Sequence, residues 1–501
     1  MRATLEPLAS AAQARAADAH TIEDLGVPGI VLMEHAGRAV AEAARRLVPG
    51  LERALVLAGP GNNGGDGWVA ARHLWGAGVP CPVVTLRAPD QLSGDAALAA
   101  QMFLATAEAH GWSSAALGAP FFLADLADDL HAVIAAVAPG VLIDALFGTG
   151  LTRAVEGVGK NAIEAMGRAP LPLLAVDVPS GLPSDGQAPQ GPVASAAMTV
   201  TFGRRKVAHA AEPGRFLCGD VAAVDIGLLE QPGAGAPAAW RLVEAQHLVP
   251  AVDPQAHKGR FGHVGVVEGE PARAGAAHLA ARAALRAGCG LCTLVVEGPP
   301  GRAPAPELMV RADPRPSELA AAFDAVVLGP GLGARADRAR PILEACAAAR
   351  TSVLVDAEAL DALAGRPLAG LACVCTPHPG EAGRLLSSSS AAVQADRLAA
   401  AHGLVELLGG VVVLKGACPV VAAPGHEPVV VEGGAPALAV AGSGDVLAGV
   451  IGALLGRGLA PLDAALVGVQ AHQRAGTRLG TRGALASDIA DAVAAVLGRP
   501  A

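Results

Sequence analysis

Tyrosine is absent from this chain of 501 residues, and aromatic residues make up only 2% of it. Charged residues are also few, at 17%, and the formal net charge is -9 without any basic block. Nucleic acids are polyanions, and proteins bind them mainly through clusters of Lys and Arg. This composition therefore excludes a main role in nucleic-acid binding, and we expect no nucleic-acid partner.

A long uncharged apolar run is also missing. The longest weakly charged stretch, Ala435–Gly456, contains an aspartate and several glycines, so a buried helix explains it better than a membrane span of about 20 apolar residues. No signal peptide is recognisable, and residues 1–20 read as an ordinary helix that carries Glu6, Arg15 and Asp18. We expect a cytoplasmic protein with no membrane partner.

The 8 cysteines are scattered along the chain, which fits a reducing compartment better than a disulfide framework. Cys289 and Cys292 have the CxxC spacing of redox and metal sites, but no second pair accompanies them. The segment also runs into an apolar strand. Core packing is therefore the favoured interpretation of this pair.

Short β-type runs alternate with Ala-rich helical segments along the whole chain, which is the pattern of a parallel sheet with helices on both faces. Leu229–Pro237 has the composition of a linker. We therefore predict an α/β protein with two domains, residues 1–232 and 238–501. The predicted strands are Ala54–Ala58, Cys81–Leu86, Val141–Asp144, Leu173–Asp177, Met198–Phe202, Val221–Asp225, Val264–Glu268, Cys292–Val296, Ala325–Leu328, Ser352–Asp356, Cys373–Thr376, Val411–Leu414 and Pro428–Glu432. The predicted helices of the second half are Ala276–Ala287, Arg335–Ala349, Gly380–Leu386 and Asp445–Leu455.

In the first predicted domain, three polar segments that contain glycine follow predicted strands. They are Asn62–Asp66, Asp144–Arg153 and Val176–Leu182. Ligands of open α/β sheets bind beyond the carboxyl ends of the strands, so three such segments favour a ligand site over three structural turns.

The residue types in these segments suggest what they bind. The backbone N–H groups of Gly148–Arg153, with a guanidinium at the end, suit a pyrophosphate. Asn63, Asp144 and Ser180 offer only hard oxygen ligands, so we expect an alkali or alkaline-earth cation there rather than zinc. The alternative for each residue is that it caps the helix that follows.

A second glycine loop, Ala441–Asp445, precedes an apolar helical pattern in the second half. Its backbone N–H groups can form an anion hole, and Asp445 at its mouth can take a proton from an attacking hydroxyl or merely cap the helix. Lys415, one of only four lysines, follows a predicted strand, and His378 lies between two prolines. No GxxxxGK[ST] pattern occurs, which argues against a P-loop enzyme.

Four motifs of the first half occur in the order Met33–Arg38, Gly59–Gly67, Asp144–Arg153 and Val176–Leu182. Together they resemble the NAD(P)H-hydrate epimerase domain, over roughly residues 10–230. The resemblance implies a Rossmann-like fold, bound potassium, and interconversion of the R and S forms of hydrated NADH and NADPH.

The same resemblance assigns roles to individual residues. Potassium would be held by Asn63, Asp144 and Ser180. Asp177 is the candidate acid/base, because inverting a carbon that bears a hydroxyl group and a nitrogen requires a reversible proton transfer. The nucleotide would be contacted by Asn62, Asn63, Gly64, Gly65, Asp66, Gly148, Thr149, Gly150, Leu151, Thr152, Arg153, Ala154 and Asp177.

The second half carries the motifs His257–Gly262, Gly329–Gly333, Thr376–Glu381, Leu414–Ala417 and Ala441–Gly449. They resemble the ribokinase-like superfamily and, more narrowly, ADP-dependent NAD(P)H-hydrate dehydratase, over roughly residues 240–498. The resemblance implies that Asp445 deprotonates the C6 hydroxyl of the S-hydrate, which attacks the terminal phosphoryl group of ADP. Loss of phosphate then gives NADH or NADPH and leaves AMP. We expect magnesium for the phosphoryl step.

By motif position, the hydrate would be contacted by Ala276, Gly333, His378 and Asp445. ADP would be contacted by Lys415, Gly416, Ala417, Cys418, Pro419 and Gly444. The expected partners are therefore the hydrates of NADH and NADPH and ADP, and we expect a homo-oligomer.

Two positions depart from the family pattern. His35 stands where Asn is usual, and Glu268-Gly269-Glu270 stands where Gly-Gly-Ser is usual, which adds negative charge near the expected nucleotide site. Two alternatives stay open. The chain could be a vitamin or sugar kinase fused to an accessory domain, or its first domain could be a binding module without catalysis.

Overall fold

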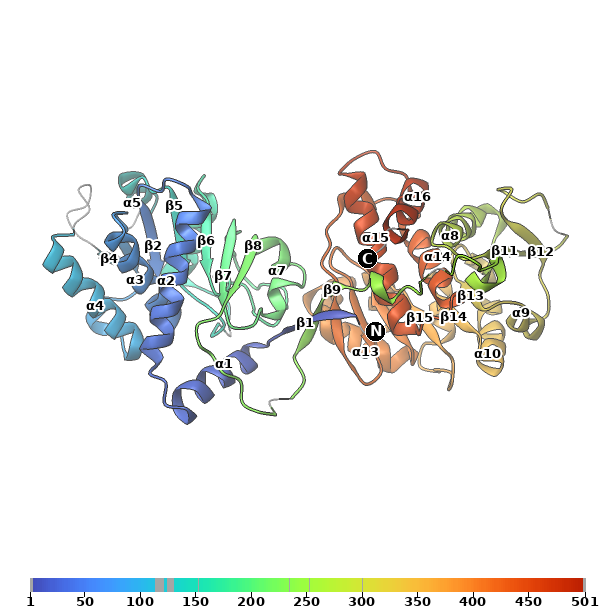
Figure 1. The fold of residues 1–501 in the computed structure, drawn as a ribbon, viewed down its shortest axis with the longest axis horizontal. Coiled ribbons are helices and arrows are strands. Elements are labelled where there is room, and N and C mark those ends of the chain that lie inside the picture. The colour runs from blue at the N-terminus through green and yellow to red at the C-terminus, as the bar shows by residue number, and fades with distance from the viewer. Residues whose placement is uncertain are drawn as a thin grey trace. The chain divides into compact units, whose positions relative to one another are not determined.

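A computed structural model describes residues 3–112, 121–123, 130–151, 153–233, 235–251, 253–299 and 301–498. It divides into two compact units (Figure 1). The N-terminal unit is Pro7–Ala238, and the C-terminal unit combines the residues up to Glu6 with the chain from Ala239 onward. The described part of the predicted linker, residues 229–237, contains no helix or strand.

The N-terminal unit is built on a seven-stranded sheet with the order β4-β3-β2-β5-β6-β7-β8, and all its strand pairs are parallel. The strands are β2 (Ala54–Ala58), β3 (Val83–Thr85), β4 (Phe121–Leu123), β5 (Val141–Ala145), β6 (Leu173–Val176), β7 (Met198–Phe202) and β8 (Asp220–Val224).

Helices cover both faces of this sheet because alternate residues of each strand point to opposite sides. Val56 packs with Trp68 and Phe103 in one core cluster, whereas Leu55 packs with Ile163 in another. The first cluster is covered by α2 (Gly29–Leu47), α3 (Asn62–Gly76) and α4 (Gly94–His110), and the second by α5 (Leu130–Val137) and α6 (Gly157–Arg168).

The C-terminal unit has an eleven-stranded sheet with the order β1-β9-β18-β17-β16-β15-β14-β13-β10-β11-β12. The run from β16 to β12 is parallel, whereas β17 pairs antiparallel with both of its neighbours. The strands are β1 (Thr4–Leu8), β9 (Ala239–Glu244), β10 (His263–Val267), β11 (Leu291–Val296), β12 (Met309–Ala312), β13 (Ala325–Leu328), β14 (Ser352–Val355), β15 (Cys373–Cys375), β16 (Val411–Leu414), β17 (Val420–Ala423) and β18 (His426–Val430).

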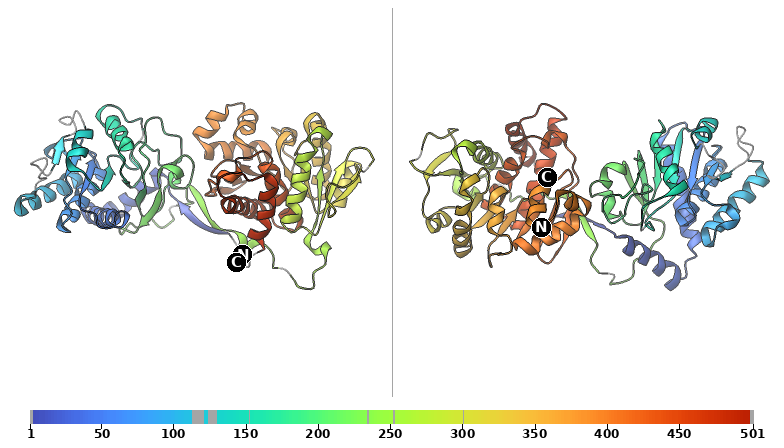
Figure 2. Two further views of the ribbon diagram at one scale, coloured as in Figure 1. Left: turned by 90° about the horizontal axis from the view of Figure 1, so that it is seen from above. Right: turned by 180° about the vertical axis from the view of Figure 1, so that it is seen from behind.

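Two helical layers enclose this second sheet, as Figure 2 shows. One layer is formed by α8 (Ala274–Arg286), α14 (Ser443–Gly456), α15 (Pro461–Leu479) and α16 (Ala486–Leu497). The other includes α9 (Pro316–Ala322), α10 (Ala339–Ala349), α11 (Pro379–Leu385) and α13 (Arg397–Leu408). All residues of α14 from Val446 onward are buried, which accounts for the apolar stretch in the sequence. Among the described residues, no helix is long and apolar enough to cross a membrane.

The prediction of one helix over residues 1–20 is wrong. Thr4–Leu8 forms the edge strand β1 of the C-terminal sheet, and only Ala11–Ala19 forms a helix, α1. Pro7 is compatible with this position, because an edge strand has N–H groups that need no partner. Every predicted strand corresponds to an observed strand. The observed strands that the sequence did not predict are β1, β4, β9, β12 and β17.

Candidate active sites

The first glycine loop closes tightly onto the start of α3. α3 begins at Asn62, four residues after β2 ends, and no side chain caps it. A Cβ atom on Gly64 would lie 1.9 Å from the carbonyl oxygen of Gly59, so the loop can approach the helix only because residue 64 is glycine. The uncapped N-terminus is suited to an anionic ligand.

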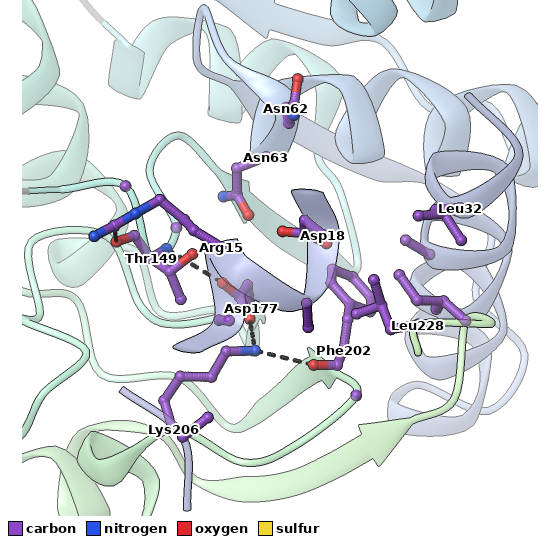
Figure 3. A pocket seen from close by; sticks show the side chains of 18 of the residues that line it. Arg15, Asp18, Leu32, Asn62, Asn63, Thr149, Asp177, Phe202, Lys206 and Leu228 are labelled. Atoms are coloured by element: carbon purple, nitrogen blue, oxygen red, sulfur yellow. Dashed lines mark hydrogen bonds and ion pairs between the residues drawn. The ribbon is translucent and has the colours of Figure 1, made fainter. Parts of the chain in front are cut away.

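A cavity of about 1320 Å³ opens in the N-terminal unit at this loop (Figure 3). Gly64 and Gly65 do not line it, Ala154 lines an adjoining cavity of about 340 Å³, and Thr152 lies outside the described residues. The predicted nucleotide contacts that do line the large cavity are Asn62, Asn63, Asp66, Gly148, Thr149, Gly150, Leu151, Arg153 and Asp177.

Asp177, at the end of β6, is a buried carboxylate held by several donors. Its Oδ1 accepts hydrogen bonds from Lys206 Nζ at 2.6 Å and Thr201 Oγ1 at 3.0 Å. Its Oδ2 accepts one from the backbone N–H of Thr149 at 3.2 Å. Burial raises the pKa of Asp177, but Lys206 outweighs burial, so the pKa is lowered and the group is ionised. Its φ of 66° is strained for a residue other than glycine.

His209 holds the backbone of Asp177 in this conformation. The backbone N–H of Lys206 donates to His209 Nδ1 at 2.9 Å, so Nε2 carries the proton and donates to the carbonyl oxygen of Asp177 at 2.9 Å. Burial and the charge of Lys206 lower the pKa of His209 to about 3, so the ring is neutral. The three residues form one rigid group.

Asp144, near the end of β5, is completely buried and does not itself line this cavity. It accepts hydrogen bonds from the backbone N–H of Ser180 at 2.8 Å and from Ser180 Oγ at 2.5 Å. Burial raises its pKa, and among the described residues no Lys or Arg forms an ion pair with it. A bound cation would supply the missing positive charge. The oxygens of Asp144, Ser180 and Asn63 therefore fit a hard cation.

The second glycine loop leads directly into α14. Gly442 is the N-cap residue, with a φ of 88°, and no side chain caps the helix. Asp445 lies in the first turn but does not act as the cap. The structural alternative for Asp445 is therefore not supported, and the first N–H groups of α14 remain suited to an anion.

Lys415 reaches from the end of β16 to this helix start. Its Nζ would lie 3.5 Å from a Cβ placed on Gly444. It pairs with Asp356 Oδ1 at 2.9 Å and with Glu381 Oε2 at 3.8 Å. Burial alone would lower the pKa of Lys415, but these two carboxylates outweigh burial and raise it, so the amine stays charged.

The pKa of Asp445 is raised to about 6, first by burial and then by the negative charges of Asp356 and Glu358, although Lys415 opposes the shift. A carboxyl group with this pKa can accept a proton near neutral pH while remaining a much stronger base than an exposed aspartate. The loop therefore combines a helix N-terminus suited to an anion, a nearby cation and a carboxyl group able to act as a base.

The negative charge expected from the departure at residues 268–270 is compensated. Glu268 accepts a hydrogen bond from His278 Nε2 at 3.1 Å. Glu270 lies 3.4 Å from Arg273 and accepts a hydrogen bond from the backbone N–H of Ala334 at 2.9 Å. His278 lies on α8, Arg273 directly precedes this helix, and Ala334 lies within the 3-10 turn Gly333–Arg338.

The other predicted residues of this half are placed around the loop. A Cβ on Gly331 would lie 3.4 Å from Ala276 Cβ, and one on Gly333 would lie 2.5 Å from the carboxylate of Glu270. His378 is exposed, and its Nδ1 accepts the N–H of Gly380 at the start of α11. Gly416 is exposed, whereas Cys418 and Pro419 are buried and lie behind the surface that a nucleotide could reach.

Several supporting residues could not be recognised from the sequence. Arg397 is buried and donates to the carbonyl oxygens of Leu414 and Lys415 at 3.1 Å each. His472, also buried, lies 3.0 Å from the carbonyl oxygen of Ser443. Lys206 was also missed, and the one available signal was its rarity, since the chain has only four lysines.

Fold and sites together define an α/β enzyme of two compact units, each with an uncapped helix N-terminus beside a carboxylate. A family described as NAD(P)H-hydrate dehydratase matches residues 264–496, and the YjeF-related protein N-terminus matches residues 29–208. The bifunctional NAD(P)H-hydrate repair enzyme Nnr of Moorella thermoacetica is 35% identical, over 98% of this chain and 96% of its own. The enzyme of the same name from Escherichia coli is 34% identical, and the match covers 93% of this chain and 89% of the length of that enzyme. The chain belongs to the family of bifunctional NAD(P)H-hydrate repair enzymes.

The solved structure of an ADP/ATP-dependent NAD(P)H-hydrate dehydratase from Bacillus subtilis is 27% identical in sequence. The match covers 50% of this chain and 94% of that chain, with a TM-score of 0.44. The predicted α/β fold class is confirmed, since each unit has a sheet with helices on both faces, and the sheet of the N-terminal unit is entirely parallel. The family assignment made from the motifs is confirmed as well.

Proposed function

We propose that this chain repairs hydrated NADH and NADPH in two steps, epimerising the R and S forms in the N-terminal unit and dehydrating the S form in the C-terminal unit. One observation carries the proposal: each unit places one aspartate, buried in the case of Asp177 and partly buried in the case of Asp445, at a site suited to an anion, but in opposite electrostatic settings. Lys206 keeps Asp177 ionised, whereas burial and neighbouring carboxylates raise the pKa of Asp445 to about 6.

For the first step, the cavity offers enough room for a dinucleotide, since pockets for smaller ligands are typically about 300–1,000 Å³. The free N-terminus of α3 and the Gly148–Arg153 segment would hold the pyrophosphate. Asp177 would accept and return the proton during inversion at C6.

For the second step, the N–H groups at the start of α14 and the ammonium group of Lys415 would hold the phosphates of ADP. Asp445 would remove the proton of the C6 hydroxyl, which attacks the terminal phosphoryl group. No group of three His, Cys, Asp or Glu side chains suited to a metal occurs in the described part of the chain. Magnesium is usually held by one or two carboxylates and the substrate phosphates, and Asp356 and Glu381 fit that role.

A potassium ion at Asp144 should stabilise the N-terminal unit. Replacing Na⁺ by K⁺ at constant ionic strength should raise the melting temperature, by the equivalent of about 2–3 kcal/mol at saturation. Asp144→Asn should abolish the difference, whereas Asp90→Asn, on an exposed turn of the same unit, should retain it. Equal melting in both salts would remove the assignment of potassium to this carboxylate.

The rate of dehydration should rise with pH through about 6 and then level off. Asp445 is the base, so only its ionised form is active, and its raised pKa places that ionisation at about 6. The measurement is the turnover of purified S-hydrate at saturating ADP across this range. A rate that is flat between one unit below and one unit above this pKa would contradict the assignment.

The complete activity can be tested on the purified chain with a mixture of R and S NADH hydrate, with and without ADP, by following the recovery of nicotinamide absorbance. Full recovery in the presence of ADP requires both steps. Recovery of the S fraction alone would show that the N-terminal unit is inactive. No recovery, with ADP intact, would refute the proposed function.

A further inference from the structure

Helix α1 forms one wall of the large cavity without being part of the core. It begins with a capping box between Ser10 and Gln13, and none of its residues is buried. Polar contacts hold it in place: the backbone N–H of Ala11 donates to Asp185 Oδ1 at 2.6 Å, and Gln13 Nε2 donates to the carbonyl oxygen of Ala236 at 2.8 Å. The residues of α1 that line the cavity are Gln13, Ala14, Arg15, Ala16, Ala17 and Asp18.

A helix that buries no side chain can present its polar residues to a ligand. In Figure 3, the carboxyl group of Asp18 points from α1 into the cavity, on the side where Asp177 and Asn63 lie. The accessible surface of Asp18 therefore includes cavity surface. Lys206 and Asp177 line the same cavity as Asp18, and the charges of both act on its pKa.

Three carboxyl groups of this cavity differ in protonation. Lys206 lowers the pKa of Asp177, whereas burial raises the pKa of Asp18 and of Asp66, and the charge of Asp177 raises both further. Carboxyl groups that share a site divide in this way because they cannot all ionise. The cavity therefore holds one carboxylate that stays ionised together with two carboxyl groups that bind a proton more tightly than an exposed aspartate does.

Inversion at C6 requires both forms. When the C6–O bond breaks, the departing hydroxyl must gain a proton to leave as water. When a water molecule adds to the opposite face of the resulting cation, it must lose a proton. The ionised Asp177 can accept that proton but has none to give at the start, so the reaction needs an acid from a different wall of the cavity.

We propose that Asp18 is the acid of the epimerisation and works together with Asp177 as the base, an inference that rests on the proposed function of the N-terminal unit. Asp18 donates its proton to the departing hydroxyl, and Asp177 takes one from the incoming water. Transfer between the two carboxyl groups then restores the starting state. Asp18 suits this role better than Asp66, which is only 8% exposed, whereas Asp18 has a larger surface open to the cavity.

The test compares Asp18→Asn with Asp24→Asn in the full chain. Asp24 is an exposed residue that pairs with His20 and does not line the cavity. Asp18→Asn should lower the rate of R-to-S conversion about 10²–10⁴-fold, mainly in kcat, and Asp18→Glu should restore part of it. Asp24→Asn should epimerise at the wild-type rate. Both variants should dehydrate purified S-hydrate with ADP at the wild-type rate, which shows that the C-terminal unit is folded, and their tryptophan fluorescence should match the wild type, which shows that the N-terminal unit is folded as well.

A pH profile separates an acid from a structural role. Wild-type epimerisation should decline at high pH as Asp18 loses its proton, and the residual activity of Asp18→Asn should lack that decline. If the wild type epimerises and Asp18→Asn matches it in rate and pH profile, only the role of Asp18 is refuted, and the proposed function of the unit stands. If the wild type does not epimerise purified hydrate, the proposed function of this unit falls, and the role of Asp18 falls with it.

Discussion

Asp445→Asn should abolish dehydration of the S-hydrate while epimerisation continues at the wild-type rate. Asn keeps the size of the side chain but cannot accept a proton from the C6 hydroxyl, so the expected loss is about 10²–10⁴-fold or more. The experiment measures both reactions on one preparation: ADP-dependent recovery of NADH from purified S-hydrate, and interconversion of the two hydrates without ADP.

This variant should also be no less stable than the wild type above a pH of about 6. The folded state raises the pKa of Asp445, so it binds this proton more tightly than the unfolded chain does. The contribution of this group to stability is therefore present at low pH and is lost as the pH rises through about 6. Asn carries no charge, so the variant avoids the cost of holding a negative charge at this partly buried position above that pH. Asp463→Asn, in the first turn of α15, is the matched control and should leave both activities unchanged. Loss of both activities in a folded Asp445→Asn chain would refute the division of labour.

Asp177→Asn should inactivate epimerisation and also destabilise the N-terminal unit. The ammonium group of Lys206 is 2.6 Å from Asp177 and almost fully buried. Removing one partner of a buried ion pair leaves an uncompensated charge and typically costs about 3–5 kcal/mol. Unfolding can be followed by tryptophan fluorescence, because Trp68, Trp75 and Trp112 lie in this unit and only Trp240 lies in the other.

A double-mutant cycle separates the two effects. Lys206→Met should also destabilise the unit, because it leaves the carboxylate of Asp177 buried without its cation. The double variant should recover most of the lost stability and still lack epimerisation, since no charged base is present. Destabilisations that simply add would show that the two side chains are not coupled, and an active double variant would exclude Asp177 as the base.

The sequence was sufficient to predict those parts of each site that lie at the end of a strand. Asp144, Asp177 and Lys415 each follow or end an apolar β run, and parallel strands bring their carboxyl ends to the same edge of a sheet. Alternation of strands and helices was also visible locally. These features depend on a few neighbouring residues, and so they can be recognised without knowing how distant segments pack.

The remaining features depend on contacts between residues far apart in sequence. The role proposed for Asp18 depends on α1 lining a cavity that later segments form, and Arg397 supports Lys415 only because its helix, α13, packs against β16. The sequence alone also predicted that Glu268 and Glu270 would add negative charge near the nucleotide site, because it did not show their partners. Their partners His278 and Arg273 lie on or beside α8, and a helix boundary alone does not reveal which side chains meet.

Strand β1 makes the C-terminal unit discontinuous in sequence, so that the N-terminal unit is inserted between β1 and β9. The two halves therefore cannot be separated into independent genes by a single cut. A cut after Ala238 would remove β1 from the dehydratase and expose the edge of β9, which is a template for unwanted strand pairing. The epimerase fragment would keep β1 without its partner strand. Stand-alone function of the C-terminal half would therefore require that β1 be supplied again or that the uncovered edge of β9 be protected in another way.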